Sequence, residues 1–477
     1  MKPKTLCWQS SAIKIVCDHG QVMNTPAFVP DLIFRPREEI QAAQERHFAQ
    51  TMDLVCTSHP HYRQLFAKLG LNRADFHGTA DLARLPLTSK HDFMGNPQSF
   101  LLGSSDVPAE MQVVWDTMYT TGTSSGKPTP FVSTAYDYYN VIAMYKRILG
   151  LRGVRGNDLI ANLCPLTVYP HGAYHRVSAA GAAMKIPVVN LLPGRPSPHF
   201  QLGSELDEVV EGIERTHATI LWGVTSYVRR VLMRAAEIGA DFSRVRLAYI
   251  TGEAVTPALR ENFEQCLHAA GARKATINVS YGITEIQGGF TECCPGGGFH
   301  NPLPEDIHVQ VVDTESHKPL PDGERGLVVI SHLNRRGTLL LRYSTGDLSV
   351  LSRSACPHCG ATTDRFTEMP QRADDLVKIK GMLVNPTVVE AAVLAVEGVS
   401  EYQALVEREN MADPFSMDRL RIRIAGAGTL ADKAPLVSLA VKQATGVTPL
   451  VECVEATAIY GLNGSLKLKR FVDQRKG

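Results

Sequence analysis

Residues 119–129 read Tyr119-Thr-Thr-Gly-Thr-Ser-Ser-Gly-Lys-Pro-Thr129, with six serines and threonines, two glycines and one lysine. Such a composition is poor for a core, a strand or a helix, but it suits a loop that wraps a phosphate group. Glycine lets backbone N–H groups turn toward an anion, hydroxyl groups donate hydrogen bonds, and lysine adds a positive charge. The spacing of Gly122 and Gly126 is shorter than in the Walker P-loop. The stretch therefore predicts a phosphate-binding loop of another type, and a solvated linker is the alternative.

The length and composition of the chain indicate a globular protein with more than one domain. It has 477 residues, of which 44% are hydrophobic and 20% charged, and its formal net charge is +1. We therefore expect two or more domains, and neither nucleic acid nor a membrane as a partner. No apolar run approaches the roughly 20 residues that span a bilayer, and the first residues lack an apolar signal core. The ten cysteines are scattered irregularly, which favours a reducing cytoplasm over a disulfide framework.

Short apolar strands alternate with amphipathic helices in the first part of the chain. We expect strands over 158–164, 186–191, 218–222, 246–250 and 275–279. We expect helices over 37–54, 62–69, 135–149, 206–216, 227–238 and 257–269. This alternation predicts an α/β domain with a mostly parallel sheet covered by helices on both faces.

The pattern changes after residue 303, where short strands are separated by turn residues. We expect these strands over 308–313, 326–332, 338–343 and 348–351. They predict an antiparallel sheet or a small β-barrel attached to the parallel sheet.

A domain boundary is expected at Arg372-Ala-Asp-Asp375, which separates a large domain, residues 1–371, from a small one, residues 372–477. The small domain reads as an α+β unit. Its expected helices cover 387–396 and 432–443, and its expected strands cover 402–406, 419–424 and 450–454.

Two polar segments follow predicted strands of the parallel sheet. Thr251-Gly-Glu253 comes directly after one strand, and Tyr281-Gly-Ile-Thr-Glu285 comes after the next strand. Ligands of such sheets collect at the carboxyl ends of the strands. We therefore expect both segments at a ligand site, although a lone glutamate after a strand is more often a solvated cap.

Five segments of the chain, in this order, resemble the motifs of the adenylate-forming superfamily, which includes acyl-CoA synthetases, luciferases and peptide-synthetase adenylation domains. The segments are Tyr119–Thr129, Ser280–Glu285, Tyr343–Asp347, Arg372–Gly381 and Gly464–Arg470. The resemblance covers residues 80 to 475 and is closest to the phenylacetate-CoA ligase branch. It implies a large adenylation domain followed by a small mobile domain that rotates about a hinge at Asp374.

The resemblance implies that ATP and Mg²⁺ bind to these segments. Thr284 would contact phosphate, Glu285 would hold magnesium, and Asp347 would accept hydrogen bonds from both ribose hydroxyls. The segment at 251–253 would lie along the adenine. Gln371 stands where the family has glycine, which leaves the contacts of Arg372 open. The implied nucleotide-binding residues are Thr121, Gly122, Thr123, Ser124, Ser125, Gly126, Lys127, Gly252, Glu253, Tyr281, Gly282, Asp347 and Arg372.

The implied activity is ATP-dependent activation of a carboxylic acid to an acyl-adenylate, with release of pyrophosphate, followed by acyl transfer to coenzyme A. Lys467 matches the catalytic lysine of the family, with Lys469 as the alternative. Coenzyme A would pass near residues 378–381. Related enzymes transfer the acyl group to an amine or to a carrier-protein thiol, and both acceptors stay open, as does a homodimer.

The acid pocket is expected between the strand that ends at Trp222 and residues 281–289. An aromatic or compact cyclic acid suits the side chains there better than a long acyl chain, although aromatic residues at such positions are more often ordinary core. The expected lining residues are Tyr169, His171, Trp222, Thr225, Tyr227, Ile283 and Gly288.

Cys356-Pro-His-Cys359 is a CxxC motif, which is commonly half of a structural zinc site. Some phenylacetate-CoA ligases look the same here, and the resemblance implies Zn²⁺ bound by Cys293, His300, Cys356 and Cys359. Cys294 is a rival to Cys293, and His358 a rival to His300. A site with four protein ligands leaves no open position, so we expect a structural rather than a catalytic metal.

Overall fold

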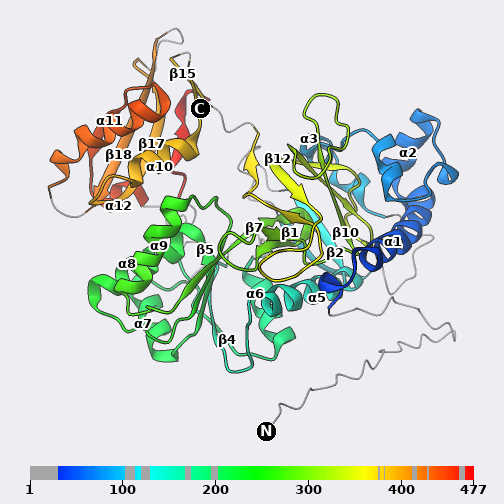
Figure 1. Ribbon diagram of the computed structural model, residues 1–477, viewed down its shortest axis with the longest axis horizontal. Helices are drawn as coiled ribbons and strands as arrows, with labels where there is room; N and C mark the ends of the chain where they lie inside the picture. Colours follow the sequence, from blue (N-terminus) through cyan, green and yellow to red (C-terminus); the bar gives the residue numbers. More distant parts are fainter. Residues whose placement is uncertain are drawn as a thin grey trace.

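The computed structural model describes residues 31–102, 113–119, 129–166, 173–194, 202–373, 377–380, 382–410, 416–426, 429–460 and 468–476 (Figure 1). A large sheet with its helices occupies the centre of the molecule, and the C-terminal part, in orange and red, forms a separate lobe beside α8 and α9 (Figure 1). Among the described residues, no helix is both long enough and apolar enough to cross a membrane.

The parallel half of the sheet has the strand order β4-β3-β5-β6-β7, and all of these neighbours pair in parallel. Its strands are β3 (Ile160–Leu163), β4 (Val188–Asn190), β5 (Ile220–Val224), β6 (Leu247–Thr251) and β7 (Thr276–Ile283). Every residue of β3 and β5 is buried, as the continuous apolar runs predicted.

Five helices accompany these strands; four of them agree with predicted helices to within two residues at each end, whereas α6 was not predicted. They are α5 (Ala135–Leu151), α6 (Ala173–Met184), α7 (Leu206–Thr216), α8 (Thr225–Ile238) and α9 (Pro257–Ala269). Thr256 caps α9, since its side chain accepts a hydrogen bond from the Leu259 N–H, and Pro257 occupies the first turn. The predicted α/β architecture is confirmed.

The antiparallel strands continue the same sheet. Beyond β7 the order is β8-β9-β13-β12-β11-β10, and β14 pairs with β12. The strands are β8 (Gly288–Glu292), β9 (Phe299–His300), β10 (Ile307–Val312), β11 (Arg325–His332), β12 (Tyr343–Ser352), β13 (Arg365–Phe366) and β14 (Gln371–Arg372). Within the described residues β10 and β4 are the two edges, so the antiparallel strands form an open sheet rather than the expected closed barrel.

The expected strands at 338–343 and 348–351 are also corrected. A single strand, β12, runs over Tyr343–Ser352, and residues before it are irregular apart from an isolated bridge between Thr338 and Leu101. Arg342 has a positive φ of 47°, and its guanidinium donates hydrogen bonds to the carbonyls of Ala83, Leu85 and His317. This left-handed residue interrupts the extended backbone, so the strand begins only at Tyr343.

The N-terminal helices pack against the irregular segment that precedes β12. His59, which caps α2, contacts the carbonyl oxygen of Leu339 at 3.1 Å, and the hydroxyl of Tyr62 donates to the carbonyl of Leu341 at 3.0 Å. The main elements here are α1 (Arg37–Ser58), α2 (Pro60–Leu69) and α3 (Lys90–Gly95), with short 3-10 turns at Leu32–Phe34, Arg73–Asp75, Thr79–Arg84 and Pro97–Phe100.

The C-terminal lobe has a four-stranded sheet in the order β19-β18-β17-β20 and its own hydrophobic core. Its elements are β15 (Val377–Ile379), β16 (Met382–Val384), α10 (Pro386–Leu394), β17 (Val399–Arg408), β18 (Asp418–Gly426), α11 (Ala434–Thr445), β19 (Leu450–Cys453), α12 (Ala456–Tyr460) and β20 (Phe471–Asp473). The sequence predicted two of its helices and three of its strands. Because this core is separate from that of the sheet, we propose the division into residues 1–371 and 372–477.

Candidate active site

Several of the predicted site residues lie outside the described residues. They are Thr121, Gly122, Thr123, Ser124, Ser125, Gly126, Lys127, Tyr169, His171, Asp374 and Lys467. Their roles stay predictions, and the site is built below from the residues around them.

The two strands that flank the serine- and threonine-rich loop form an antiparallel hairpin. They are β1 (Val114–Tyr119) and β2 (Pro130–Thr134), and Tyr119 pairs with Pro130. Val132 in β2 exchanges hydrogen bonds of 2.9 Å with Thr338, and the ring of Phe131 lies 6.0 Å from that of His332. The hairpin is therefore fixed against the segment around His332, which leads to the next group of site residues.

His332 connects this hairpin to Glu285. Its Nε2 lies 2.9 Å from the backbone carbonyl of Glu285, and its Nδ1 accepts a hydrogen bond from the Leu340 N–H at 3.0 Å. Burial, together with Arg335, holds the pKa of His332 well below its usual value, so the ring is neutral. A neutral ring with Nδ1 as acceptor must carry its proton on Nε2, and it therefore donates to the carbonyl of Glu285.

Two tyrosine–carboxylate pairs join the segments at 281–285 and 343–347 crosswise. The hydroxyl of Tyr343 donates to Oε1 of Glu285 at 2.7 Å, and the hydroxyl of Tyr281 donates to Oδ2 of Asp347 at 2.5 Å. All four residues are buried. Segments separated by about 60 positions in the sequence, as the two hydrogen bonds span 58 and 66 residues, thus form one polar cluster.

Burial and the adjacent carboxylates raise the pKa of both tyrosines well above the usual value for a phenol. The hydroxyls therefore remain protonated and act as donors, which fixes one oxygen of each carboxylate. Within the described part of the chain, no side chain or N–H donates to Oε2 of Glu285. This oxygen can bind a metal ion or accept a hydrogen bond from a ligand hydroxyl.

Arg372 lies beside Asp347 because β14 pairs with β12 at these two residues. Its Nε is 3.5 Å from Oδ1 of Asp347, and its Nη1 donates to the carbonyl of Thr345 at 2.7 Å. A fixed guanidinium at this position places positive charge next to the carboxylate. The substitution of the family glycine by Gln371 does not displace Arg372 from Asp347.

The segments after β6 and β7 lie side by side at the carboxyl ends of these strands. A Cβ on Gly282 would approach Oγ1 of Thr251 to 2.8 Å, and Gly252 has a positive φ of 86°. Glu253 accepts hydrogen bonds from the N–H and hydroxyl of Ser226 on Oε2, while its Oε1 is buried and has no hydrogen-bond partner among the described residues. The predicted adenine-binding segment thus adjoins the end of β7, which includes Ile283 and is followed by Thr284.

The C-terminal motif reaches the same region. Arg470 donates from Nη1 to the hydroxyl of Ser226 at 3.1 Å and forms an ion pair of 3.0 Å with Glu401. Since Ser226 also holds Glu253, the residues that follow Lys467 lie next to the 251–253 segment. Lys469 is described, and its carbonyl accepts a hydrogen bond from Gln403 at 3.2 Å.

The expected acid-pocket residues that are described lie mostly in the core. Trp222 and Tyr227 are each 3% exposed, and Trp222 packs against Tyr249 with 4.3 Å between ring centroids. Thr225 donates to the carbonyl of Thr251 at 3.3 Å. A Cβ on Gly288 would lie 2.0 Å from Cε of Met144, so a larger residue there would require the Met144 side chain to move. Their role as pocket lining stays a prediction.

Arg176 is a site residue that the sequence did not reveal. It projects from α6, is 1% exposed, and donates from Nη2 to Oε1 of Gln287 at 2.5 Å. Its Nη1 lies 3.0 Å from Oδ2 of Asp116, and its guanidinium lies 5.0 Å from the ring centroid of Tyr138. A buried arginine next to the 281–288 segment supplies positive charge there. In the sequence it is an isolated charge in an alanine-rich helix, and its partner is 111 positions away.

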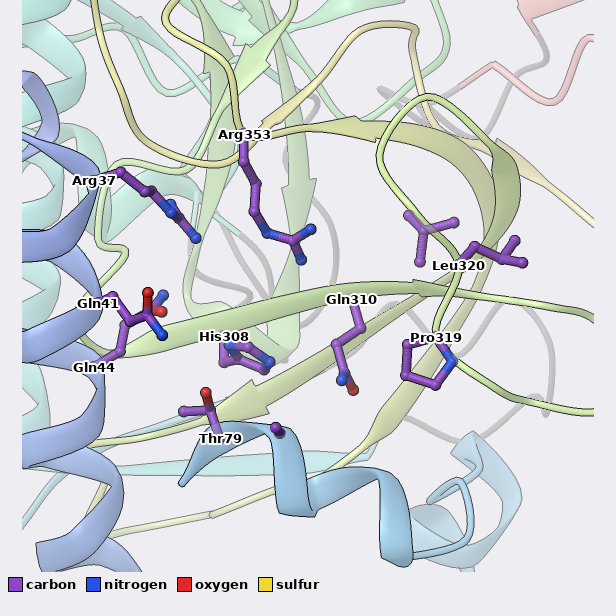
Figure 2. Close-up of a pocket in the computed structure, with 11 residues that line it drawn as sticks. Arg37, Gln41, Gln44, Thr79, His308, Gln310, Pro319, Leu320 and Arg353 are labelled. Carbon is purple, nitrogen blue, oxygen red and sulfur yellow. The ribbon is translucent and has the colours of Figure 1, made fainter. Parts of the chain in front are cut away.

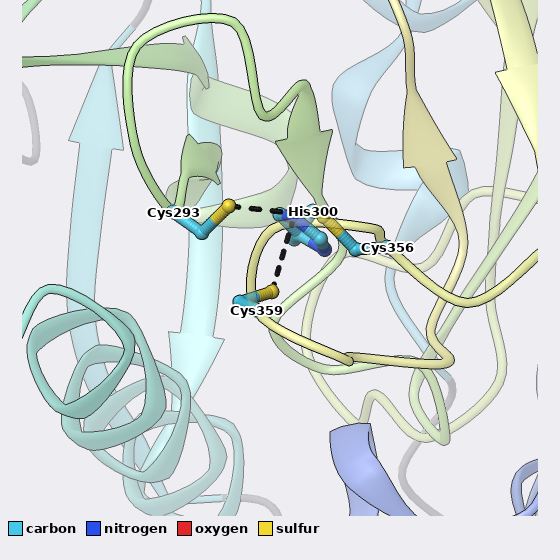
Figure 3. Close-up of side chains that lie close together, drawn as sticks. All are labelled: Cys293, His300, Cys356 and Cys359. Atoms are coloured by element: carbon cyan, nitrogen blue, oxygen red, sulfur yellow. Dashed lines mark hydrogen bonds between the residues drawn. The ribbon is translucent and has the colours of Figure 1, made fainter.

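Four side chains form a candidate metal site where the parallel and antiparallel strands meet (Figure 3). Ligand atoms of Cys293, His300, Cys356 and Cys359 all lie within 4.8 Å of one another, and Cys294 and His358 are not part of the group. Sγ of Cys293 is 3.9 Å from Sγ of Cys356, and Sγ of Cys359 is 3.7 Å from Nε2 of His300. A tetrahedron with zinc–sulfur bonds of about 2.3 Å has sulfur–sulfur edges of about 3.8 Å, which matches this spacing.

The electrostatics of this cluster also fit a metal ion. Burial lowers the pKa of His300 to about 4, so its ring is neutral and its Nε2 can act as a ligand. Burial and the neighbouring cysteines raise the pKa of the Cys293 thiol. Without a cation, several buried sulfurs cannot all ionise beside one another. A divalent ion removes that repulsion because it stabilises the thiolates.

Comparison with known proteins agrees with this geometry. Residues 118–334 match the family model described as AMP-binding enzyme. The phenylacetate-coenzyme A ligase of Thermus thermophilus is 29% identical over 81% of this chain and 82% of its own length. The phenylacetate-coenzyme A ligase of Escherichia coli is 26% identical over 80% of this chain and 82% of its own length.

The fold is shared with solved structures of 2-hydroxyisobutyryl-CoA ligase. Its structure in the postadenylation state superposes with a TM-score of 0.77 at 19% identity, over 98% of this chain and 96% of that chain. Its structure in the thioesterification state gives a TM-score of 0.63 at 21% identity. The chain therefore contains an AMP-binding enzyme domain, has phenylacetate-coenzyme A ligases among its relatives, and shares its fold with a solved CoA ligase.

Proposed function

We propose that this protein activates a compact carboxylic acid, rather than a long-chain one, with ATP and then transfers the acyl group to coenzyme A.

 The acid class is aromatic or compact and cyclic. The observation that carries the proposal is the crossed pair of hydrogen bonds, Tyr343 to Glu285 and Tyr281 to Asp347, which brings two of the resembling segments into one buried polar cluster.

In the proposed first step, a carboxylate oxygen of the acid attacks the α-phosphorus of ATP. The bond between that phosphorus and the bridging oxygen breaks, pyrophosphate leaves, and an acyl-adenylate remains. In the second step the thiol of coenzyme A loses its proton, its sulfur attacks the acyl carbon, and AMP leaves. Such phosphoryl chemistry depends on positioning and on neutralising charge.

We assign the residues of the crossed pair to different ends of the nucleotide. Asp347 accepts the ribose hydroxyls, a role that suits a carboxylate because it is an acceptor only. Glu285 holds Mg²⁺ through the oxygen that Tyr343 leaves unoccupied, and Thr284 contacts phosphate. Magnesium at this position would offset the negative charge of the phosphate groups.

The remaining nucleotide contacts are proposed from the loops. Residues 121–127 would surround the β- and γ-phosphates, and residues 251–253 would lie along the adenine. Lys467 is the proposed catalytic lysine, with Lys469 as the alternative. The contact of Arg470 with Ser226 supports this assignment, because it brings the C-terminal motif to the 251–253 segment.

We assign the docked arrangement of the C-terminal lobe to the first step. The same contact supports this choice, because a lysine near Arg470 can reach the nucleotide only when the lobe is docked. The higher TM-score with the postadenylation structure than with the thioesterification structure, 0.77 against 0.63, agrees with it.

A compact acid is supported by the packing around the expected pocket. Met144 lies against Gly288, so a long acyl chain could pass this residue only if the Met144 side chain moved. Trp222, Tyr249 and Tyr145 place aromatic rings beside this region. The relatives with sequence similarity are named for phenylacetate, an aromatic acid, and for coenzyme A as the acceptor.

We also propose a structural zinc ion on Cys293, His300, Cys356 and Cys359. Its four protein ligands would leave no position for a substrate. The cluster joins the end of β8 and strand β9 to the loop between β12 and β13. Zinc would therefore hold the junction between the two halves of the sheet.

A panel of carboxylic acids, assayed for pyrophosphate release with and without coenzyme A, tests the function. We expect an aromatic or cyclic acid to support release, and a thioester to form only when coenzyme A is present. If the activated acid couples to an added amine and no thioester forms, the assignment of coenzyme A as the acceptor is wrong. Lys467→Ala and Lys469→Ala, compared in the same assay, identify the catalytic lysine.

A further inference from the structure

A cavity on the opposite side of strand β10 from the core is not used by the proposed reaction (Figure 2). Its volume is about 420 Å³, and it is lined by α1, the turn at Thr79–Arg84, β10, the loop that carries Leu320, and Arg353. Ligand pockets range from about 300 to 1,000 Å³, so this cavity suits a compact molecule. Arg353 follows β12 six residues after Asp347, which places it about 20 Å from the active-site carboxylate.

Two arginines supply positive charge to the cavity. Figure 2 shows Arg37 and Arg353 both extending into the space above His308. Arg37 forms an ion pair of 2.8 Å with Asp364, and Arg353 lies 3.4 Å from the same carboxylate and also pairs with Asp322. Nη1 of Arg37 is buried and has no hydrogen-bond partner among the described residues. Among those residues, no acidic side chain lines the cavity.

Two polar side chains of β10 face the cavity where apolar ones would give a more stable structure. His308 and Gln310 alternate along the strand with Val309 and Val311, which are buried. Gln310 is 7% exposed, and its Oε1 has no hydrogen-bond partner in the described part of the chain. A buried polar atom without a partner destabilises the structure, so a ligand that donates a hydrogen bond to it would be favoured.

The imidazole of His308 adds a neutral polar group. Burial lowers its pKa to about 4, with Arg353 and Arg37 acting in the same direction against Asp364. At neutral pH the ring can therefore donate one hydrogen bond and accept another. The opposite wall is apolar and includes Pro319 and Leu320 (Figure 2).

We propose that this cavity is a second binding site, which takes a compact organic anion that carries hydroxyl groups. The anionic head lies against Arg37 and Arg353, a hydroxyl donates to Oε1 of Gln310, and the carbon skeleton contacts Leu320. The unpaired N–H on Arg37 favours a ligand with a hydrogen-bond acceptor, and the unpaired oxygen of Gln310 favours a ligand with a donor. A ligand that carries an anionic group and a hydroxyl group supplies both. A phosphate or a carboxylate would satisfy the head position.

The test is calorimetric titration of the full-length protein with glycerol 3-phosphate, glycerate and glycerol. Each titration is made with ATP at saturation, so that the nucleotide site is occupied. We expect saturable binding of at least one of the two anions and none of glycerol, which carries no charge. The anion that binds with the higher affinity shows whether the site prefers a phosphate or a carboxylate head group.

Two variants show whether binding occurs in this cavity. Arg37→Gln removes the charge, and Gln310→Met removes the acceptor at similar volume, so each should weaken binding about tenfold or more. Arg234→Gln, which removes an arginine from an exposed ion pair with Asp207, is the matched control and should bind as the wild type does. Absence of saturable binding by both anions to the wild type would overturn the proposal. Equal binding by the wild type and the Gln310→Met variant would also overturn it.

Discussion

At the scale of single residues, the candidate site depends on tyrosines that hold carboxylates. Tyr343 and Tyr281 each donate to one oxygen of a buried carboxylate. This leaves Oε2 of Glu285 for a ligand, whereas Oδ1 of Asp347 lies 3.5 Å from Nε of Arg372. This arrangement orients each carboxylate and leaves its negative charge in place, because a tyrosine with a raised pKa keeps its proton.

Tyr343→Phe should slow adenylation about 10–100-fold, since a residue that orients a metal-binding carboxylate contributes on that scale. The fold should be retained, because a single hydrogen bond contributes about 0.5–1.5 kcal/mol to stability. The measurement is acid-dependent pyrophosphate release, with thermal unfolding of the same samples. Tyr62→Phe, which removes another buried tyrosine hydroxyl, is the control and should lower stability without this loss of activity. Equal activities of the two variants would contradict the role of Tyr343.

Buried neutral histidines make the stability of the protein depend on pH. Burial lowers the pKa of His59 to about 3, below the usual value of 6.5. In acid the unfolded chain takes up a proton that the folded protein does not, so stability is lost as the pH falls below about 6.5. His59→Asn, which retains a capping side chain for α2, should be less stable at pH 7 and lose less stability between pH 6.5 and 4. Thermal unfolding across this range measures the difference, and parallel pH profiles would rule out His59 as the cause.

At the scale of elements, local signals predicted helices well and long-range pairing poorly. The bounds of α7 agree with the expected 206–216, because its acidic first turn and its apolar residues at helical spacing lie within the element itself. Strand β20 was missed because Phe471–Asp473 is short and pairs in parallel with β17, far away in the sequence. The expected barrel failed for a similar reason, since the sequence does not show that β9 and β13 join the two halves of one sheet.

In the candidate site too, the sequence predicted residues within local motifs but not the contacts between distant segments. The order of motifs predicted roles for Glu285 and Asp347, which stay predictions, but it gave no sign that Tyr343 and Tyr281 donate to them crosswise. Arg176 was missed altogether, because its role depends on Gln287, which only the folded chain brings near it.

The proposed zinc site is a property of the junction between β8, β9 and β13. Elemental analysis of the purified protein should find one zinc ion per chain. Cys359→Ser should lose the metal and lower the unfolding temperature, because structural zinc contributes directly to folding. Cys294→Ser is the matched control, since Cys294 adjoins the group without belonging to it, and it should retain zinc. A folded wild-type protein without zinc would contradict the assignment.

At the scale of the whole molecule, a buried charge network joins the two lobes. Arg229 in α8 donates to Oε2 of Glu401 in β17 at 2.8 Å, and Arg470 binds Oε1 of the same carboxylate. Both Arg229 and Glu401 are 1% exposed. A second contact, from Thr256 to Glu390 at 3.1 Å, lies in the same interface. Buried charges depend strongly on their partners, so the network favours one arrangement of the lobes.

Arg229→Leu should weaken docking of the C-terminal lobe, because it leaves Glu401 with fewer partners in a buried position. We expect a larger radius of gyration in solution scattering and a greater loss in adenylation than in thioester formation from a supplied acyl-adenylate. Arg234→Leu on the same helix is the control, because its exposed ion pair with Asp207 lies outside the interface. Identical scattering by the two variants would contradict the role of the network.

The most direct test of the central claim is acid-dependent exchange of pyrophosphate into ATP by the wild type and by Glu285→Gln. The account predicts that exchange requires a carboxylic acid, occurs without coenzyme A, and falls at least about 100-fold in the variant, since Glu285 is assigned to the magnesium that offsets phosphate charge. Exchange that is equal in the two proteins would contradict this account of the site. No exchange by the wild type with any acid of the panel would contradict the proposed activity itself.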